Sequence, residues 1–189
     1  MRIISGFNKG KKLIMPNNKK TRPLKDMAKE SIFNILAHAK FIDFHLKDSN
    51  VLDLFSGIGS FGLECISRQA TYACFIEKEK EALKILASNI KKLKVEKKTK
   101  IFFNDVFDLI EKQNINLSKF DLIFCDPPFE DSNVGKLIKL ILNKQLLKKN
   151  GVIILHRKKN IEEQLPDCFN ILDIRIYGLS KIIFGKLLA

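Results

Sequence analysis

The sequence of 189 residues lacks tryptophan and has no long run of apolar residues. A membrane-spanning helix needs roughly 18 or more consecutive apolar residues, and no segment reaches that length. The N-terminus carries Lys9, Lys11 and Lys12 where a secretory signal would need an apolar stretch. These absences predict a cytoplasmic protein that does not interact with membranes.

Cysteine and histidine are scarce and scattered. The four cysteines are Cys65, Cys74, Cys125 and Cys168, and the three histidines are His38, His45 and His156. None of them has the close spacing of a zinc site, and a disulfide framework needs a denser set. We therefore expect reduced, mostly buried thiols and no bound metal, and we interpret the histidines as ordinary helix or strand-end residues.

Acidic residues are absent from the first 25 positions, although the chain has 21 Asp and Glu and a net charge of +13. A basic surface without acids favours a polyanion through phosphate contacts and counterion release. We predict that nucleic acid binds there. The predicted contacts are Arg2, Lys9, Lys11, Lys12, Lys19 and Lys20. A second lysine-rich run at 91–100 is either another such surface or the solvated end of a helix.

Strand-like apolar runs alternate with segments of helical periodicity along one predicted domain, 1–189. Residues 1–20 are expected to form a basic hairpin appendage, 21–40 a leading helix and 45–189 the α/β core. The expected strands are 51–55, 72–76, 101–103, 122–125, 152–155, 171–177 and 181–187. The expected core helices are a helix from about 60 to 68, then 79–93, 106–111, 134–142 and a short one near Ile161. This alternation predicts a parallel sheet with helices on both faces, and the short link between the last two runs predicts an antiparallel hairpin.

A glycine-rich turn follows the first strand of this core. Gly57 and Gly59 begin a GxGxxG pattern, and a helix is expected from about Ser60. This context is typical of folds that bind a dinucleotide or a nucleoside. Taken alone, the pattern equally fits a tight strand-to-helix turn in any α/β protein.

Three acids make the pattern more specific. Glu77 follows Gly57 by 20 residues and can accept both ribose hydroxyls of a nucleoside. Asp53 would repel a pyrophosphate beside the turn and favours a ligand with an ammonium or sulfonium group. Asp105 can accept from an adenine amino group or cap the next helix. Together the three acids favour S-adenosylmethionine over a nicotinamide cofactor.

The fourth core strand ends abruptly in Asp126-Pro127-Pro128-Phe129. Two prolines rigidify the turn, so we expect backbone carbonyls without local partners beside the Asp126 carboxylate. Such acceptors fit an amino group, which has two hydrogens to donate. Phe129 can stack on the base that carries the amine. The alternative is a strand-terminating loop with a core phenylalanine, but its position after the glycine turn favours methylation of an exocyclic base nitrogen.

These motifs, with the opening residues 2–13, Arg22-Pro23 and the closing Tyr177-Gly178, resemble the RsmD-type 16S ribosomal RNA guanine-N2 methyltransferases over nearly the whole chain. The resemblance implies a class I S-adenosylmethionine-dependent methyltransferase fold, Rossmann-like, with a mostly parallel seven-stranded sheet. It also implies transfer to a guanine amine in the small ribosomal subunit. A monomer is expected. The sequence departs from the family at Met27 and Lys29, where arginines are frequent.

The resemblance also assigns roles to residues. It implies cofactor contacts at Arg22, Asp53, Phe55, Gly57, Gly59, Glu77, Asp105 and Val106. It implies catalytic roles for Asp126, Pro127, Pro128 and Phe129, with Asp126 and the Pro127 carbonyl orienting the amine. Two alternatives stay open: an adenine-N6 methyltransferase of DNA or RNA, and a non-catalytic RNA-binding ribosome assembly factor.

Overall fold

The computed structural model describes residues 1–16, 26–112 and 119–188. Its elements in chain order are α1 (Asp26–His38), β1 (Asn50–Leu54), α2 (Ser60–Ser67), β2 (Tyr72–Glu77), α3 (Lys80–Leu93), the 3₁₀ turn η1 (Glu96–Lys98), β3 (Thr99–Phe103), α4 (Val106–Lys112), β4 (Phe120–Cys125), α5 (Val134–Asn143), β5 (Leu147–Lys158), β6 (Phe169–Tyr177) and β7 (Ser180–Leu187). Within the described residues, no helix is both long and apolar enough to cross a membrane.

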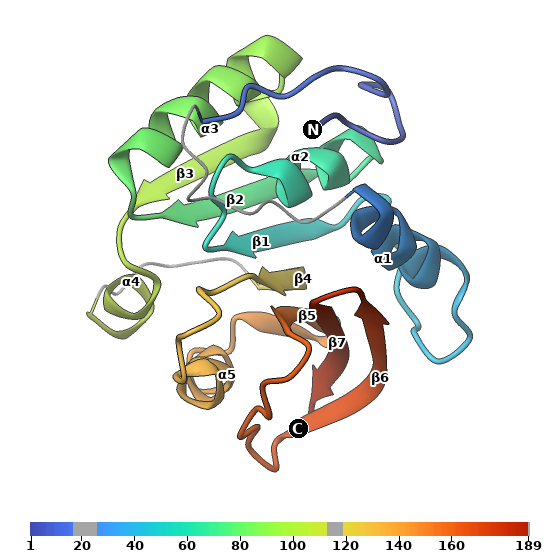
Figure 1. The fold of residues 1–189 in the computed structure, drawn as a ribbon, viewed down its shortest axis with the longest axis vertical. Coiled ribbons are helices and arrows are strands. Elements are labelled where there is room, and N and C mark those ends of the chain that lie inside the picture. The colour runs from blue at the N-terminus through green and yellow to red at the C-terminus, as the bar shows by residue number, and fades with distance from the viewer. Residues whose placement is uncertain (17–25, 113–118, 189) are drawn as a thin grey trace.

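The strands form one seven-stranded sheet in the order β3-β2-β1-β4-β5-β7-β6 (Figure 1). The first five strands in this order pair in parallel, and β7 pairs antiparallel with both β5 and β6. The predicted parallel sheet and its antiparallel C-terminal hairpin are confirmed. Connections leave β1 toward β2 and β4 toward β5, in opposite directions, so a crevice opens at the carboxyl ends of β1 and β4.

Helices cover both faces of the sheet, as predicted. On one face, α1, α2 and α3 pack with the N-terminal segment against a core that includes Val51 of β1. On the other face, α4 and α5 pack against Leu52 and Leu54. Because both faces are buried, the central strands are apolar at almost every position. Asp53 is the buried polar residue of β1.

The N-terminal segment is a hairpin within residues 1–16. Arg2 and Lys12 form an antiparallel bridge, and the Ile3 amide donates to the Lys11 carbonyl at 3.0 Å. Arg2, Lys9, Lys11 and Lys12 are exposed. The predicted hairpin is therefore confirmed as far as residue 16, whereas Lys19, Lys20 and Arg22 lie outside the described residues.

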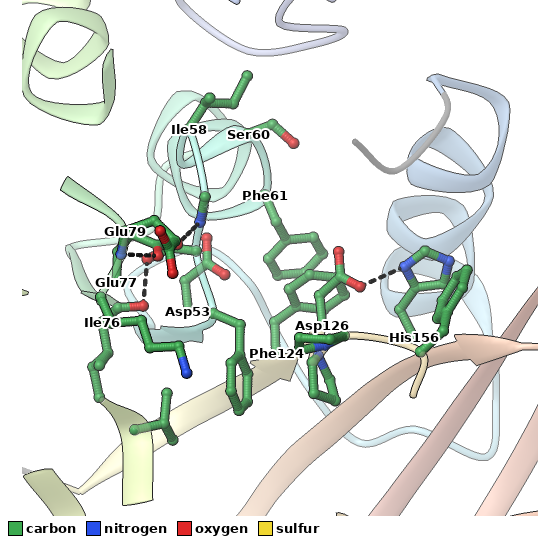
Figure 2. A pocket seen from close by; sticks show the side chains of 18 of the residues that line it. Asp53, Ile58, Ser60, Phe61, Ile76, Glu77, Glu79, Phe124, Asp126 and His156 are labelled. Atoms are coloured by element: carbon green, nitrogen blue, oxygen red, sulfur yellow. Dashed lines mark hydrogen bonds and ion pairs between the residues drawn. The ribbon is translucent and has the colours of Figure 1, made fainter. Parts of the chain in front are cut away.

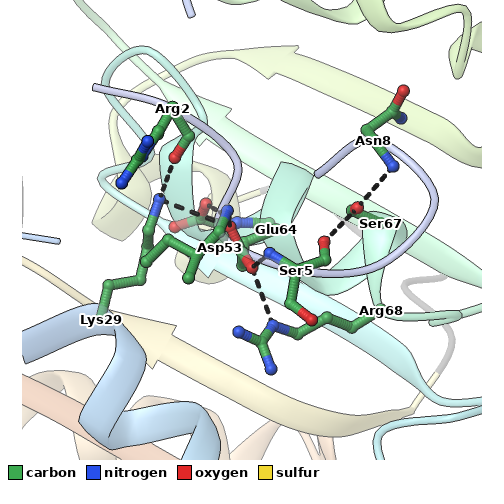
Figure 3. Close-up of polar contacts among 10 residues, drawn as sticks. Arg2, Ser5, Asn8, Lys29, Asp53, Glu64, Ser67 and Arg68 are labelled. Carbon is green, nitrogen blue, oxygen red and sulfur yellow. Dashed lines mark hydrogen bonds and ion pairs between the residues drawn. The ribbon is translucent and has the colours of Figure 1, made fainter. Parts of the chain in front are cut away.

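A fully buried carboxylate, Glu64 of α2, holds the hairpin on the core (Figure 3). It accepts hydrogen bonds from the amides of Ile4 at 2.8 Å and Ser5 at 2.9 Å. It also pairs with Arg68 at 2.8 Å and with Lys29 of α1 at 3.5 Å. Burial lowers the pKa of Lys29, and the Glu64 charge opposes that shift. Lys29, a point of departure from the family, therefore has a structural partner in the interior.

One predicted element is wrong. No helix forms near Ile161 between β5 and β6 in the described residues. Side chains hold this segment instead, because Lys181 donates to the Ile161 carbonyl and Arg157 pairs with Glu163. The helical pattern there is short, so tertiary contacts decided its conformation.

Candidate active site

A cavity of about 540 Å³ opens at the carboxyl ends of β1, β2 and β4, a size typical of ligand pockets (Figure 2). Residues far apart in the sequence meet there. Of the predicted site residues, the lining includes Asp53, Phe55, Gly57, Glu77, Val106, Asp126, Pro127, Pro128 and Phe129. The structure therefore places the two predicted motifs, the glycine turn and the residues after β4, at one cavity.

The turn between β1 and α2 has three residues with positive φ angles: Phe55 at 60°, Gly57 at 54° and Gly59 at 78°. Phe55 is not a glycine, so its conformation is strained at the edge of the cavity. Gly59 is not part of the lining. A Cβ there would lie 2.3 Å from Cδ1 of Leu86, so this glycine permits close packing of the turn on α3.

Glu77 at the end of β2 stabilises this turn by accepting hydrogen bonds from backbone amides. Its Oε2 accepts from the Gly57 amide at 2.6 Å, and its Oε1 accepts from the Glu79 amide at 2.7 Å. Each carboxylate oxygen can accept a further hydrogen bond. Glu77 is therefore fixed and still able to bind hydroxyl groups, and its role with a ribose stays a prediction.

Asp53 is 1% exposed and lines the cavity from β1. Burial raises its pKa well above the ordinary value, although the hydrogen bond from the Gly62 amide at 2.9 Å acts in the opposite direction. The nearby carboxyl groups of Asp126 and Glu77 raise that pKa further. Three carboxyl groups thus act on the same space, and a cation bound there would relieve their repulsion.

Asp105 acts as a helix cap, the alternative that the sequence left open. Its Oδ1 accepts from the Phe107 amide at 2.9 Å, and its Oδ2 pairs with Lys78 at 3.1 Å. Partial burial raises the pKa of this carboxyl, but the Lys78 and backbone hydrogen bonds outweigh burial and lower it overall. Its neighbours Asn104 and Val106 line the cavity, whereas Asp105 does not. A contact with adenine stays a prediction.

Asp126 follows β4, and its Oδ1 lies 2.8 Å from Nδ1 of His156 on β5. His156 is 4% exposed, and its Nε2 lies 2.8 Å from the Ser180 hydroxyl. The interpretation of His156 as an ordinary strand-end residue is therefore wrong, because it lies in the site. The sequence offered one signal, a histidine just after the apolar run of the strand beside β4.

Arg157, the next residue of β5, holds the loop after β4 from the opposite face of the strand. Its guanidinium donates to the carbonyls of Pro128 at 2.9 Å, Phe129 at 3.2 Å and Asp131 at 2.7 Å, and pairs with Glu163 at 2.5 Å. The expectation that the prolines leave carbonyls without local partners is wrong for Pro128, because its carbonyl also accepts from the Asp131 amide at 2.9 Å. The partner of the Phe129 carbonyl is the distant Arg157. Arg157 is 1% exposed, so four acceptors compensate its buried charge.

Aromatic side chains complete the lining. Phe129 is half-buried, and its ring meets the His156 ring edge-on, with centroids 5.4 Å apart. Phe61 of α2 stacks on Phe124 of β4 with centroids 3.9 Å apart, and both line the cavity. The cavity thus offers apolar ring surface beside the three carboxyl groups (Figure 2).

The hairpin leads toward the cavity. Asn89 of α3 binds both the amide and the carbonyl of Ile14, at 2.7 and 3.2 Å, and also the carbonyl of Ile58 in the glycine turn, at 3.2 Å. Met15 and Pro16 line the cavity. At the hairpin tip, the Lys98 ammonium lies 5.8 Å from the centroid of the exposed Phe7 ring. Part of the second lysine run therefore adjoins the basic hairpin.

In the parts of the chain that the structure describes, no group of three or more His, Cys, Asp or Glu could hold a metal ion. The four cysteines are free thiols.

Comparisons with known proteins show the family of this chain. The model of the family Cons_hypoth95, described as conserved hypothetical protein 95, matches residues 1–186. The chain is 31% identical to a putative rRNA methyltransferase YlbH of Bacillus subtilis over 98% of both chains. It is 35% identical to ribosomal RNA small subunit methyltransferase D of Buchnera aphidicola, covering 83% of this chain and 78% of that one. The crystal structure of a putative methylase from Haemophilus influenzae superposes with a TM-score of 0.79 at 29% identity, covering 100% of this chain and 98% of that one.

Proposed function

Because the chain belongs to the Cons_hypoth95 family, we propose that it is an S-adenosylmethionine-dependent methyltransferase acting on the N2 amino group of a guanine in 16S ribosomal RNA. Relatives named as small-subunit ribosomal RNA methyltransferases match most of its length. The observation that carries the proposal is the placement of Asp126 at the same cavity as Asp53 and Glu77. A site for a cationic nucleoside and a site for an amine are thereby adjacent.

S-adenosylmethionine supplies the methyl group and carries a sulfonium and an ammonium beside a nucleoside. The carboxyl groups of Asp53, Glu77 and Asp126 favour those positive charges. Glu77 is held by two backbone amides in a position to accept ribose hydroxyls. Arg22, which lies outside the described residues, remains proposed at the methionine end, and Asp105 and Val106 at the adenine end.

Asp126 performs the acceptor chemistry. The guanine amine is a weak nucleophile because its lone pair is delocalised into the ring. Asp126 and the Pro127 carbonyl accept its two hydrogens and direct the lone pair at the methyl group. Bound S-adenosylmethionine would give its methyl group to this nitrogen and leave as S-adenosylhomocysteine, and Asp126 would accept the proton that the nitrogen releases. Phe129 stacks on the base, which must leave any helix that holds it.

The RNA surface is proposed to be the basic hairpin together with its neighbours at the tip. Arg2, Lys9, Lys11 and Lys12 are exposed there, and Lys19 and Lys20 follow in the part outside the described residues. The exposed Phe7 and the adjacent Lys98 extend this surface with a ring and a charge. An assembled or assembling small subunit in the cytoplasm is the proposed substrate, and a monomer the proposed active form.

The decisive experiment incubates the protein with labelled S-adenosylmethionine and small ribosomal subunits from a strain that lacks the corresponding gene. We expect label in N2-methylguanosine after nucleoside analysis, and none with subunits that already carry the modification. Label in N6-methyladenosine would show that the target base is adenine and not guanine. Cofactor binding without transfer to any subunit would support a non-catalytic assembly factor.

A further inference from the structure

We propose that His156, itself held by Ser180, is a positioning residue that fixes the Asp126 carboxylate for the methyl acceptor. This inference rests on the proposed function, because it concerns how Asp126 receives the amine. His156 is part of β5 and does not belong to the motif after β4. It reaches that motif because β4 and β5 are parallel neighbours in the sheet.

The contact defines the tautomer of the imidazole ring. An ionised carboxylate has no hydrogen to donate, so the 2.8 Å contact between Oδ1 of Asp126 and Nδ1 of His156 requires a hydrogen on Nδ1. The Ser180 hydroxyl lies 2.8 Å from Nε2 and can donate to that nitrogen or accept from it. Ser180 therefore holds the ring whether the imidazole is neutral or charged.

The ring has little freedom to turn. Asp126 contacts it from the end of β4, Ser180 from the start of β7, and Phe129 packs against it edge-on. The imidazole side chain is 5% exposed, whereas that of Asp126 is 26% exposed. The buried His156 ring, hydrogen-bonded on both sides, thus holds Oδ1 of the partly exposed Asp126 carboxylate (Figure 2). Asp126 can then present Oδ2 to the amine.

Contacts of the tight turn between β6 and β7 fix the position of Ser180. The Lys159 amide donates to the Leu179 carbonyl at 2.8 Å, and the Tyr177 hydroxyl is hydrogen-bonded to Ser31 of α1. The chain of contacts from α1 through this turn to Asp126 is continuous. Positioning of Asp126 therefore depends on the antiparallel part of the sheet as well as on the loop after β4.

The first test compares the methyl-transfer kinetics of His156→Ala, His156→Asn and Ser180→Ala. Losing the partner that orients a metal ligand typically costs roughly 10- to 100-fold in activity, and we take the same range for a partner that orients a carboxylate acceptor. We expect kcat of His156→Ala to fall by about that factor, with the KM for RNA and the Kd for S-adenosylmethionine changed little. An asparagine amide can donate toward Asp126, so His156→Asn should recover part of the loss. Ser180→Ala should lose less than about 10-fold.

The exposed His45 and Ser88 provide matched controls, and His45→Ala and Ser88→Ala should keep wild-type rates. A kcat of His156→Ala equal to that of the wild type would overturn the inference, as would a loss seen entirely in cofactor affinity. Equal rates for His156→Asn and His156→Ala would exclude the hydrogen bond as the cause.

A second measurement separates this inference from the proposed function. Nitrogen-15 NMR of the histidine rings, assigned with His156→Ala, should show the His156 hydrogen on Nδ1. Asp126→Ala should remove that preference. A ring protonated only at Nε2 would overturn the inference even if the enzyme is active. If the wild-type protein transfers no methyl group, the proposed function fails, and the NMR result still decides whether His156 holds Asp126.

Discussion

The loops after β1 and after β4 form two sides of one cavity, but different kinds of contact hold them. After β1, carboxylates accept from backbone amides: the Gly62 amide donates to Asp53, and the Gly57 amide donates to Glu77 at the end of the adjacent strand β2. After β4, two consecutive residues of β5, His156 and Arg157, hold the Asp126 side chain and the carbonyls that follow it. The loop after β1 is thus held by carboxylates that accept from backbone amides, whereas the loop after β4 is held by side chains of the neighbouring strand β5 that contact a carboxylate and backbone carbonyls.

Asp126→Ala should separate the roles of the two loops most clearly, because it should affect methyl transfer and not cofactor binding. Transfer should fall by about 10³-fold, because an acceptor on the reacting amine is lost, as for other groups that stabilise a transition state. The Kd for S-adenosylmethionine should change by less than about 3-fold, since Asp53 and Glu77 remain. Transfer assays and calorimetry measure the two effects. Asp173→Ala on β6 is the control, and an unchanged rate for Asp126→Ala would disprove the site.

Arg157→Met tests whether β5 holds the acceptor loop. The variant leaves the buried Glu163 side chain without its partner and removes the guanidinium donor to the Phe129 and Asp131 carbonyls. The free energy of unfolding should therefore fall by about 3 kcal/mol. Urea denaturation measures this change. Arg175→Met is the matched control, because Arg175 pairs with Asp173 on the surface and should show no measurable effect. If Arg157→Met and the wild type were equally stable, the loop after β4 would not need Arg157 for its stability.

Asp53→Asn tests the electrostatics of the cofactor side. Because burial raises the pKa of Asp53, the unliganded protein keeps a proton there above the pH at which an ordinary aspartate ionises. A cationic cofactor favours the ionised form, so its affinity should rise as pH increases through that range. Asp53→Asn should flatten this dependence and weaken binding by about 10-fold, or about 1.4 kcal/mol. Calorimetry over pH measures both effects, with the exposed Asp43→Asn as control.

The raised pKa of Asp53 affects the stability of the unliganded protein in the opposite direction: cofactor affinity should rise with pH, whereas stability should fall. A carboxyl whose folded pKa is raised binds more protons in the folded state, so the unliganded protein should lose stability as pH rises from the ordinary pKa toward the raised one. Asp53→Asn should remove that loss. A stability that rises over this pH range in the wild type and not in the variant would contradict the assigned direction.

The smallest expected effects lie outside both loops. Phe7→Ala and Lys98→Ala should each weaken binding to small-subunit RNA by about 3- to 5-fold, since a stacking ring or one phosphate contact is lost from an exposed surface. Neither should change the Kd for S-adenosylmethionine. Filter binding at two salt concentrations measures the effect, with Lys139→Ala on α5 as control. If Lys139→Ala weakened RNA binding equally, the binding would depend on the overall positive charge and not on the proposed surface.

The sequence predicted the elements with strong patterns. Alternation of apolar runs and helical periodicity determined the order of strands and helices, and the glycine turn with Asp53 and Glu77 lies where it was expected. The prediction of β5 was too short, because it covered 152–155 whereas the strand runs from Leu147 to Lys158. Charged and polar residues at 156–158 ended the apolar run, although His156 and Arg157 are buried.

What the sequence alone determined was therefore the sheet, the hairpin and the two motifs that face the cavity, because each depends on short-range patterns of apolar, glycine and proline residues. Only the tertiary structure decided that His156 reaches Asp126, that Arg157 occupies the carbonyls after Pro127, and that Glu64 and Lys29 hold the hairpin. The physical reason is common to all three. A buried polar side chain is stable only beside partners that compensate its desolvation, and those partners come from other elements.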